Sequence, residues 1–347
     1  MLEAARESNV IASSYGITAL KDANGFNEYV EAFHELDRAG QLRMHVAVAL
    51  NTPTGARTSP LDYDALVATR DRFRSPHVDP SFVKLFLDGV PTPARSAAML
   101  DPYVPDETHG AHFSGETNFT IGTLARDLTE LDRRGFTVKI HAAGDRSVRL
   151  ALDAVEVARR FNGPSGRCHE LAHAGYIDPQ DIPRFATLDV AADFSPILWH
   201  PSPIIQSIIG AVGERGRQYW PTRSLLESGA PLLVGSDWPA AVRDQNPWMG
   251  IEALVTRRDP RGETKGELWP EQAVSLADAL YLYTLSTARA LRLEQKIGSL
   301  TPGKSADFIV LDRDLFEVPV EAIGDTQVRE TYFEGQRVYT RRNSGGQ

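Results

Sequence analysis

The chain has 347 residues, of which 42% are hydrophobic and 24% charged, and this composition excludes a disordered chain and a small disulfide-stapled scaffold. A net charge of -9 argues against nucleic acid or an anionic membrane as the main partner. One cysteine, Cys168, excludes a disulfide framework, and we find neither a membrane-spanning apolar stretch nor a secretion signal. We therefore expect a cytoplasmic protein with a large buried core.

Most of the chain alternates amphipathic helices with short apolar strands. Residues 28–39 and 122–134 each place apolar side chains on one helical face, and Gly40 and Gly135 follow them in the position of a left-handed cap. This alternation predicts a parallel α/β sheet. Apolar strands are predicted at 17–23, 43–49, 82–88, 137–143, 169–174, 189–196 and 231–237.

Seven predicted strands are one fewer than a TIM-like (β/α)8 barrel requires. The alternative is an open, doubly wound nucleotide-binding sheet. No glycine-rich phosphate-binding motif follows any of the strands, so the barrel is favoured. We assign it to residues 1–296, ending after a helix at about 272–292.

The pattern changes from about residue 297, where short β-rich segments are separated by glycines. Segments at 297–303, 305–314, 328–335 and 336–342 predict four strands of an antiparallel sheet, which we interpret as part of a small β-sandwich over 297–342. Residues 343–347 are predicted to be a disordered tail.

Polar residues lie at or near the carboxyl ends of the predicted barrel strands, where barrel enzymes place their functional groups. These residues are Lys84, Asp88, His141, His173 and Asp237. The alternation of apolar and polar positions along each strand points them into the barrel.

The inward direction of His173 requires that Ala172 and Ala174 face outward. The same parity points Lys139 and His169 inward, deeper in the barrel.

Two imidazoles, a carboxylate and a lysine at one mouth fit a divalent transition metal such as zinc, with an open position for water. A lysine ammonium is a poor ligand, but a neutral lysine amine can take up carbon dioxide and become an anionic carbamate. Plainer interpretations remain: His141 as a hydrogen-bonded core residue, Asp237 as a turn cap, and Lys84 paired with Asp88. Glycosidase chemistry from Asp88 and Asp237 is a further alternative that leaves both histidines unexplained.

The motifs around these residues resemble the amidohydrolase superfamily, and more narrowly the amidohydrolase 3 branch, which includes N-substituted formamide deformylase-like enzymes. The resemblance covers nearly the whole chain. It rests on F-V-K-L-F-L-D-G (82–89), K-I-H-A-A-G-D-R (139–146), H-E-L-A-H-A (169–174), G-S-D-W-P (235–239) and G-S-L-T-P-G-K-S-A-D-F-I-V-L-D (298–312).

The resemblance implies a role for each matched residue. Lys84 would be a carboxylated, metal-bridging lysine, and His141 and His173 would be metal ligands. Asp237 would be both a ligand and the catalytic group that takes a proton from metal-bound water. The implied reaction is hydrolysis of a non-peptide C–N bond in a small amide-type or formamide-type substrate, with one or two divalent ions, expected to be zinc.

One departure from the family pattern is clear. The family ends its first barrel strand in a His-x-His pair that holds the more buried metal, and this chain contains no His-x-His. Residues 17–23 match the second strand of the family, so we expect that an N-terminal segment is missing. The alternative function is therefore a catalytically inactive, truncated amidohydrolase fragment without the primary metal pair.

Long connections at 50–80 and 89–120 are expected to shape the pocket. Its apolar walls would come from Tyr103, Phe113, Trp199 and Trp238, although packing roles would explain these side chains equally well.

Overall fold

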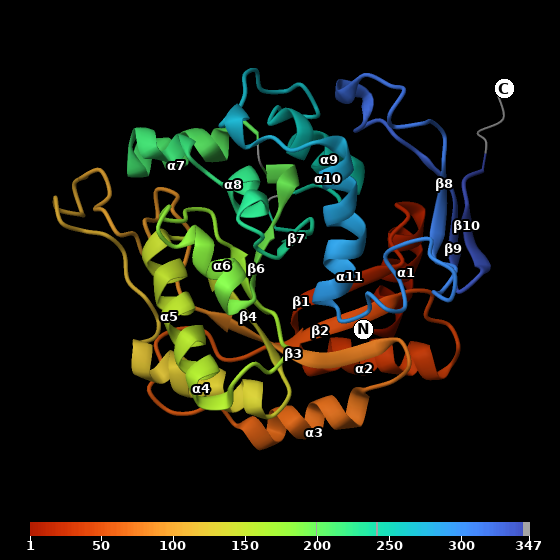
Figure 1. Ribbon diagram of the computed structural model, residues 1–347, viewed down its shortest axis with the longest axis horizontal. Coiled ribbons are helices and arrows are strands. Elements are labelled where there is room, and N and C mark those ends of the chain that lie inside the picture. Colours follow the sequence, from red (N-terminus) through yellow and green to blue (C-terminus); the bar gives the residue numbers. More distant parts are fainter. Residues whose placement is uncertain (199, 241, 343–347) are drawn as a thin grey trace.

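The computed structural model describes residues 1–198, 200–240 and 242–342, and its largest element is a curled parallel sheet (Figure 1). Seven strands follow one another in sequence order across the sheet, each parallel to its neighbours. All of the predicted barrel strands are present, so the barrel class is confirmed. The strands are β1 (Ala19–Gly25), β2 (His45–Leu50), β3 (Val78–Phe86), β4 (Thr137–Ala142), β5 (His169–His173), β6 (Val190–Phe194) and β7 (Leu232–Val234).

Helices connect the strands and cover the outer face of the sheet (Figure 1). The predicted helix at 122–134 begins where Thr120 accepts a hydrogen bond from the backbone of Thr123 in a reciprocal capping box. The α-helices are α1 (Leu2–Ser14), α2 (Asn27–Arg38), α3 (Tyr63–Phe73), α4 (Ile121–Arg133), α5 (Asp145–Asn162), α6 (Ile182–Leu188), α7 (Pro203–Val212), α8 (Thr222–Glu227), α9 (Pro247–Thr256), α10 (Leu276–Tyr281) and α11 (Thr287–Ala290). Shorter turns of helix are η1 (Pro196–Leu198), η2 (Glu214–Arg217), η3 (Pro270–Gln272), η4 (Leu282–Ser286) and η5 (Val320–Ala322).

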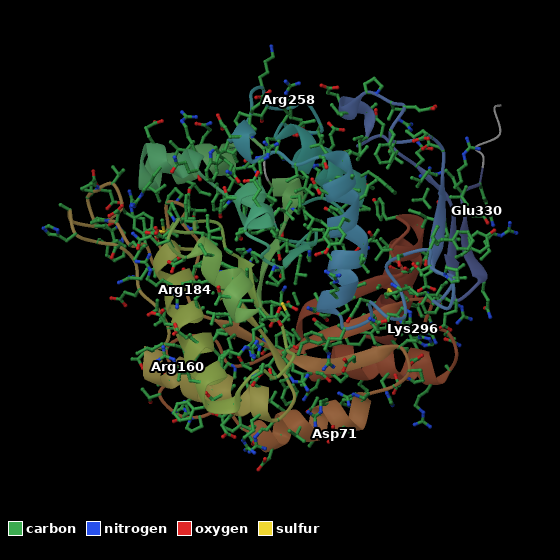
Figure 2. All side chains as sticks on the ribbon, viewed as in Figure 1. Asp71, Arg160, Arg184, Arg258, Lys296 and Glu330 are labelled. Carbon is green, nitrogen blue, oxygen red and sulfur yellow. The ribbon has the colours of Figure 1, made fainter. Side chains whose placement is uncertain are left out.

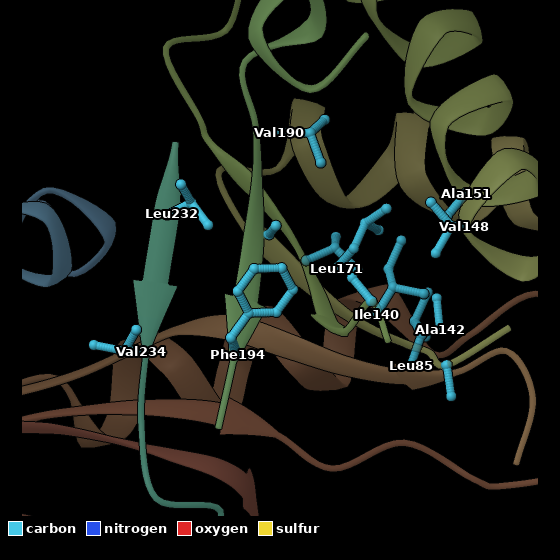
Figure 3. Close-up of a cluster of buried hydrophobic side chains, with 14 of the residues drawn as sticks. Leu85, Ile140, Ala142, Val148, Ala151, Leu171, Val190, Phe194, Leu232 and Val234 are labelled. Atoms are coloured by element: carbon cyan, nitrogen blue, oxygen red, sulfur yellow. The ribbon is translucent and has the colours of Figure 1, made fainter. Parts of the chain in front are cut away.

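The main core lies between the sheet and these helices. Leu85, Ile140 and Leu171, from three neighbouring strands, lie in one apolar cluster with Val148 and Ala151 of α5 (Figure 3). All five side chains are fully buried, and burial of each large aliphatic side chain contributes roughly 1.5–3 kcal/mol. Because alternate residues of a strand face opposite sides, this packing turns the residues between the apolar positions toward the inside of the curled sheet.

A second, antiparallel sheet in the order β10-β9-β8 follows the barrel. It contains β8 (Phe308–Leu311), β9 (Val328–Phe333) and β10 (Gln336–Thr340), so the described residues hold three of the four predicted strands. The prediction of a strand at 297–303 was wrong, because this segment turns back on itself: Gly298 and Gly303 have φ of +87° and +94°. The sheet packs on α1, where Thr331 donates a hydrogen bond to the Ser13 carbonyl. The predicted tail at 343–347 lies outside the described residues.

Charged side chains lie around the periphery, as Arg160, Arg184 and Glu330 illustrate in Figure 2. Within the part of the chain that is described, we find no helix with the length and apolar character needed to cross a bilayer.

Candidate active site

A cavity of about 930 Å³ opens inside the curled sheet. Lys84, His173 and Asp237 lie in its wall. His141 lies beside His173, with 4.4 Å between the two ring centroids. Four of the five polar residues that were predicted at strand ends thus gather in one region, at the carboxyl ends of β3, β4 and β5 and just beyond β7.

The tautomer of His141 is set by the start of the long connection after β3. Its Nε2–H donates to the Gly89 carbonyl at 2.9 Å, which leaves the lone pair on Nδ1. Burial, together with the positive charge of Lys84, lowers the pKa of His141 to about 4. His141 is therefore neutral at physiological pH, as a metal-binding imidazole must be.

His173 reaches the cavity by a route that the sequence did not predict. Glu170 and Ala172 line the cavity, whereas Leu171 belongs to the outer core, so the expected parity of β5 was wrong. The strand ends in a left-handed turn, with φ of +70° at His173 and +36° at Ala174, and this turn redirects the His173 side chain into the cavity. Burial lowers the pKa of His173 well below its ordinary value, with His141 and lysine charges acting in the same direction.

His169, expected to point inward, instead faces α4. Its Nδ1 accepts a hydrogen bond from the backbone of Val138, and its Nε2 lies 3.2 Å from Oδ1 of Asp132. His169 therefore joins the strands to a helix and takes no part in the cavity.

Lys84 is buried in the cavity wall, and its position on β3 is secured by Thr52, whose hydroxyl donates to the Lys84 carbonyl at 2.6 Å. Burial lowers the pKa of Lys84 to about 8, against the opposing effect of the Asp237 and Glu170 carboxylates. This shift enlarges the fraction of neutral amine near neutrality, which is the form that carbamate formation requires. Burial also raises the pKa of Asp237, although Lys84 and Lys139 oppose the shift.

Asp88 does not belong to the cavity wall, contrary to the expected inward direction. Its carboxylate accepts hydrogen bonds from the backbone N–H groups of Ala98 at 2.9 Å and of Ala143 and Gly144 at 3.0 Å. It joins the connection after β3 to the end of β4. The described residues contain no Lys84–Asp88 ion pair, and no carboxylate pair forms with Asp237 across the cavity.

The floor of the cavity holds a network that sequence reasoning identified only at Lys139. Glu170 pairs with Lys21 and, at 3.3 Å, with Lys139, and Lys139 also pairs with Asp193. Burial opposes ionisation of Glu170, but the two lysines keep its pKa below the ordinary value. Inward parity on β1 and β6 was the available signal for Lys21 and Asp193, whereas the parity expected for β5 pointed Glu170 outward.

Of the four candidate wall residues, Trp238 lines the cavity. Tyr103 is buried and donates its hydroxyl to the Ala97 carbonyl at 2.8 Å, and Phe113 lies beside it, 6.1 Å between ring centroids. Neither contributes to this cavity. Trp199 lies outside the described residues.

The side chains of the cavity region determine whether a metal ion could bind there. Among the described residues, no three side chains drawn from His, Cys, Asp and Glu are arranged to share one ion. The two adjacent neutral imidazoles nevertheless supply two donors, and carboxylation of Lys84 would supply an anionic third. The residues present therefore fit a metal whose site is completed by a modified lysine.

Comparison with known proteins agrees with this arrangement. The model of the amidohydrolase family matches residues 3–339. The chain belongs to this family. It is similar to Protein LONG AFTER FAR-RED 3 of Arabidopsis thaliana, with 33% identity over 264 residues, or 74% of this chain and 42% of that protein. It is also similar to N-substituted formamide deformylase of Arthrobacter pascens, with 27% identity covering 76% of this chain and 46% of the relative.

Among solved structures, an uncharacterized metal-dependent hydrolase from Pyrococcus horikoshii superimposes with a TM-score of 0.72 and 25% identity, covering 91% of this chain and 60% of that one. The expected amidohydrolase resemblance is confirmed. This family member spans less than half the length of the two curated relatives described above.

Proposed function

We propose that this amidohydrolase is a metal-dependent hydrolase that cleaves a non-peptide C–N bond in a small amide or formamide. The observation that carries the proposal is the gathering of Lys84, His173 and Asp237 in one cavity wall with His141 beside them, in a chain that matches the amidohydrolase family over residues 3–339. The similarity to an N-substituted formamide deformylase supports the bond type.

His141, His173 and a carboxylated Lys84 would hold a divalent metal, expected to be zinc. The metal, when bound, supplies Lewis-acid polarisation of the substrate carbonyl and a water of lowered pKa.

The residues of the chain contribute three separate actions. The Gly89 carbonyl fixes the His141 ring with Nδ1 free to bind. The buried surroundings of Lys84 favour the neutral amine that carboxylation needs. Asp237 accepts the proton released from water and returns it to the departing amine, a role that suits a partly buried carboxylate of raised pKa.

The cavity supports a small-molecule substrate. Its volume of about 930 Å³ is in the upper part of the range for ligand pockets, and Trp238 offers an aromatic surface beside Asp237. A fitting substrate would place its acyl or formyl group beside the polar side chains of the wall. Its amine would carry an apolar substituent that packs against Trp238.

The test is metal analysis combined with hydrolysis of N-substituted formamides and N-acyl amines, before and after treatment with a chelator. We expect bound zinc, chelator-sensitive release of amine, and loss of both metal and activity in His173→Ala. The matched control is His34→Ala, which removes an imidazole that contacts the Phe73 carbonyl on the outer layer. Failure to bind any divalent metal, or chelator-resistant activity on glycosides, would overturn the proposal.

A further inference from the structure

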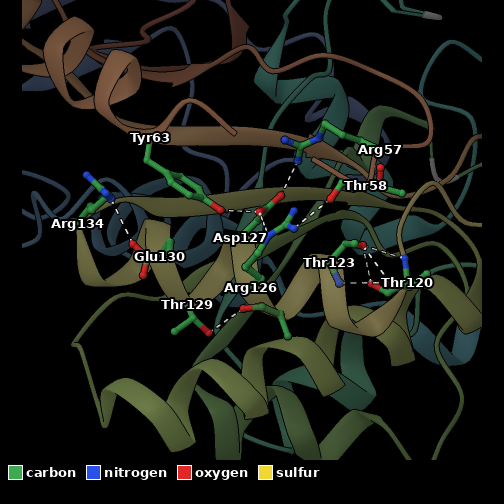
Figure 4. Close-up of polar contacts among 11 residues, drawn as sticks. Arg57, Thr58, Tyr63, Thr120, Thr123, Arg126, Asp127, Thr129, Glu130 and Arg134 are labelled. Carbon is green, nitrogen blue, oxygen red and sulfur yellow. Dashed lines mark hydrogen bonds and ion pairs between the residues drawn. The ribbon is translucent and has the colours of Figure 1, made fainter. Parts of the chain in front are cut away.

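A second cavity, of about 560 Å³, lies apart from the one that holds Lys84 and Asp237, and the two share no lining residue. It is formed by the connection after β2, the segment that leads into α4, and the start of α5. The side chains of Arg57 and Arg146 line it, together with the hydroxyl-bearing residues Thr58, Thr120 and Thr123. Figure 4 shows this region on the Arg57 side, around the N-terminus of α4.

The charges around this cavity are unbalanced. Asp127 is a buried carboxylate that Arg57 contacts at 2.5 Å, Arg126 at 3.0 Å and the Tyr63 hydroxyl at 2.6 Å (Figure 4). Arg146 has no carboxylate partner among the described residues, and its guanidinium donates to backbone carbonyls instead. Two guanidinium groups thus share one carboxylate, and the third, that of Arg146, has none among the described residues.

Several donors of this arginine group have no acceptor in the described part of the chain. They are Nε and Nη1 of Arg57, Nη2 of Arg126 and Nε of Arg146. A buried donor without a partner costs free energy, and the cost is larger for a charged group. An anion in the cavity would offset the positive charge of these guanidinium groups.

The start of α4 adds to the attraction for an anion. The helix is 13 residues long, and Ile121 and Gly122 of its first turn do not have the reciprocal side-chain bonds that Thr120 and Thr123 make. Because Ile121, the first residue of α4, lines the cavity, the positive end of the helix dipole lies beside the space that the two arginines line.

We propose that this cavity binds a small oxyanion, the phosphate or carboxylate group of a metabolite, at a site separate from the catalytic one. A guanidinium offers parallel N–H donors that match two oxygens of either group. The site has a direct connection to the strand that carries Lys84: Asn118 lines the cavity and donates its side-chain amide to the Phe86 carbonyl at 2.9 Å. Anion binding would therefore hold the end of β3 in place.

The experiment is calorimetric titration with inorganic phosphate and, separately, with acetate. We expect phosphate to bind the wild-type protein and Arg146→Gln to weaken binding about tenfold or more, since a charge-assisted donor pair is lost. Arg160→Gln is the matched control, because Arg160 is on the same helix but 73% exposed and paired with Glu156; its affinity should equal that of the wild type. Stronger binding of phosphate than of acetate would assign the phosphate group, and the reverse would assign the carboxylate.

A second variant keeps the test independent of folding. Ile121 is exposed at the cavity and is the first residue of α4, so Ile121→Glu introduces a carboxylate there without removing a polar contact and suits a helix N-terminus. We expect Ile121→Glu to keep its melting temperature and to lose anion binding, whereas Asp237→Asn should bind phosphate as the wild type does. Absence of binding by the wild type to either anion, or wild-type affinity in both Arg146→Gln and Ile121→Glu, would overturn the proposal.

Discussion

The barrel cavity has two polar regions, which differ in how their side chains are paired. The floor consists of Lys21, Lys139, Glu170 and Asp193, and the mouth of Lys84, His141, His173 and Asp237. On the floor, Lys21 and Lys139 meet Glu170 and Asp193 in direct ion pairs, so each of these polar groups has a partner. At the mouth, His141 and His173 are neutral because burial lowers the pKa of both. The floor is complete as it stands, whereas the mouth presents donors that still have a partner to gain. The difference teaches that burial of polar groups alone does not mark a reactive site; the unused bonding capacity does.

The largest expected effect is on catalysis at the mouth. Asp237→Asn removes the proton acceptor, and we expect kcat/KM to fall on the order of 10²–10⁴-fold while the melting temperature changes little. The measurement is steady-state amide hydrolysis together with thermal unfolding. Asp71→Asn, which changes an exposed carboxylate on α3 (Figure 2), is the control and should leave both values unchanged. Full activity in Asp237→Asn would contradict the assignment of catalysis to the mouth of the cavity.

The next effect is on stability, at the floor. Glu170→Gln leaves two buried lysines without their shared carboxylate, and we expect the free energy of unfolding to fall by about 3–5 kcal/mol in a urea titration. Glu156→Gln changes an exposed carboxylate on α5 and should cost less than about 0.5 kcal/mol. If the two variants were equally stable, the floor network would not have the structural role assigned to it.

The smallest effect is the pH dependence of stability in the metal-free protein. The unfolded-state pKa of His141 is about 6.5 and its folded-state pKa is about 4, so the unfolded chain binds more protons between these values. The contribution of His141 to stability is therefore full above pH 6.5 and is lost as the pH falls toward 4, by about 2 kcal/mol between pH 6.5 and 5. Urea titrations at the two pH values should show a smaller loss in His141→Asn than in the wild type; an identical loss would exclude His141 as the source.

The sequence predicted the strands, and the position of the mouth residues near strand ends, because both depend on local patterns. Buried strands between capped helices are visible as apolar runs, and Lys84, His141 and Asp237 follow from their positions near strand ends. The parity of β5 could not be obtained in this way. The alternation ends at His173, which has a left-handed backbone conformation that histidine seldom adopts. No glycine just before it in the sequence indicates such a turn.

Long-range contacts account for the other differences. Nothing near Asp88 in the sequence indicates that its carboxylate binds backbone groups from residues 98, 143 and 144. The pairing of His169 with Asp132, and of Glu170 with Lys21 on a strand 149 residues away, likewise depends on how the sheet curls. The strand predicted at 297–303 failed for a local reason, since two glycines of positive φ made the segment a turn.

The carboxylate of Asp88 has a mechanical consequence. It bonds at once to the connection after β3, through Ala98, and to the two residues that leave β4 just past His141, Ala143 and Gly144. Movement of the connection at Ala98 therefore pulls on the backbone beside His141 through a single rigid anchor. The His141 ring is itself bonded to Gly89 at the start of the same connection, so the position of the connection and the orientation of the imidazole are fixed together.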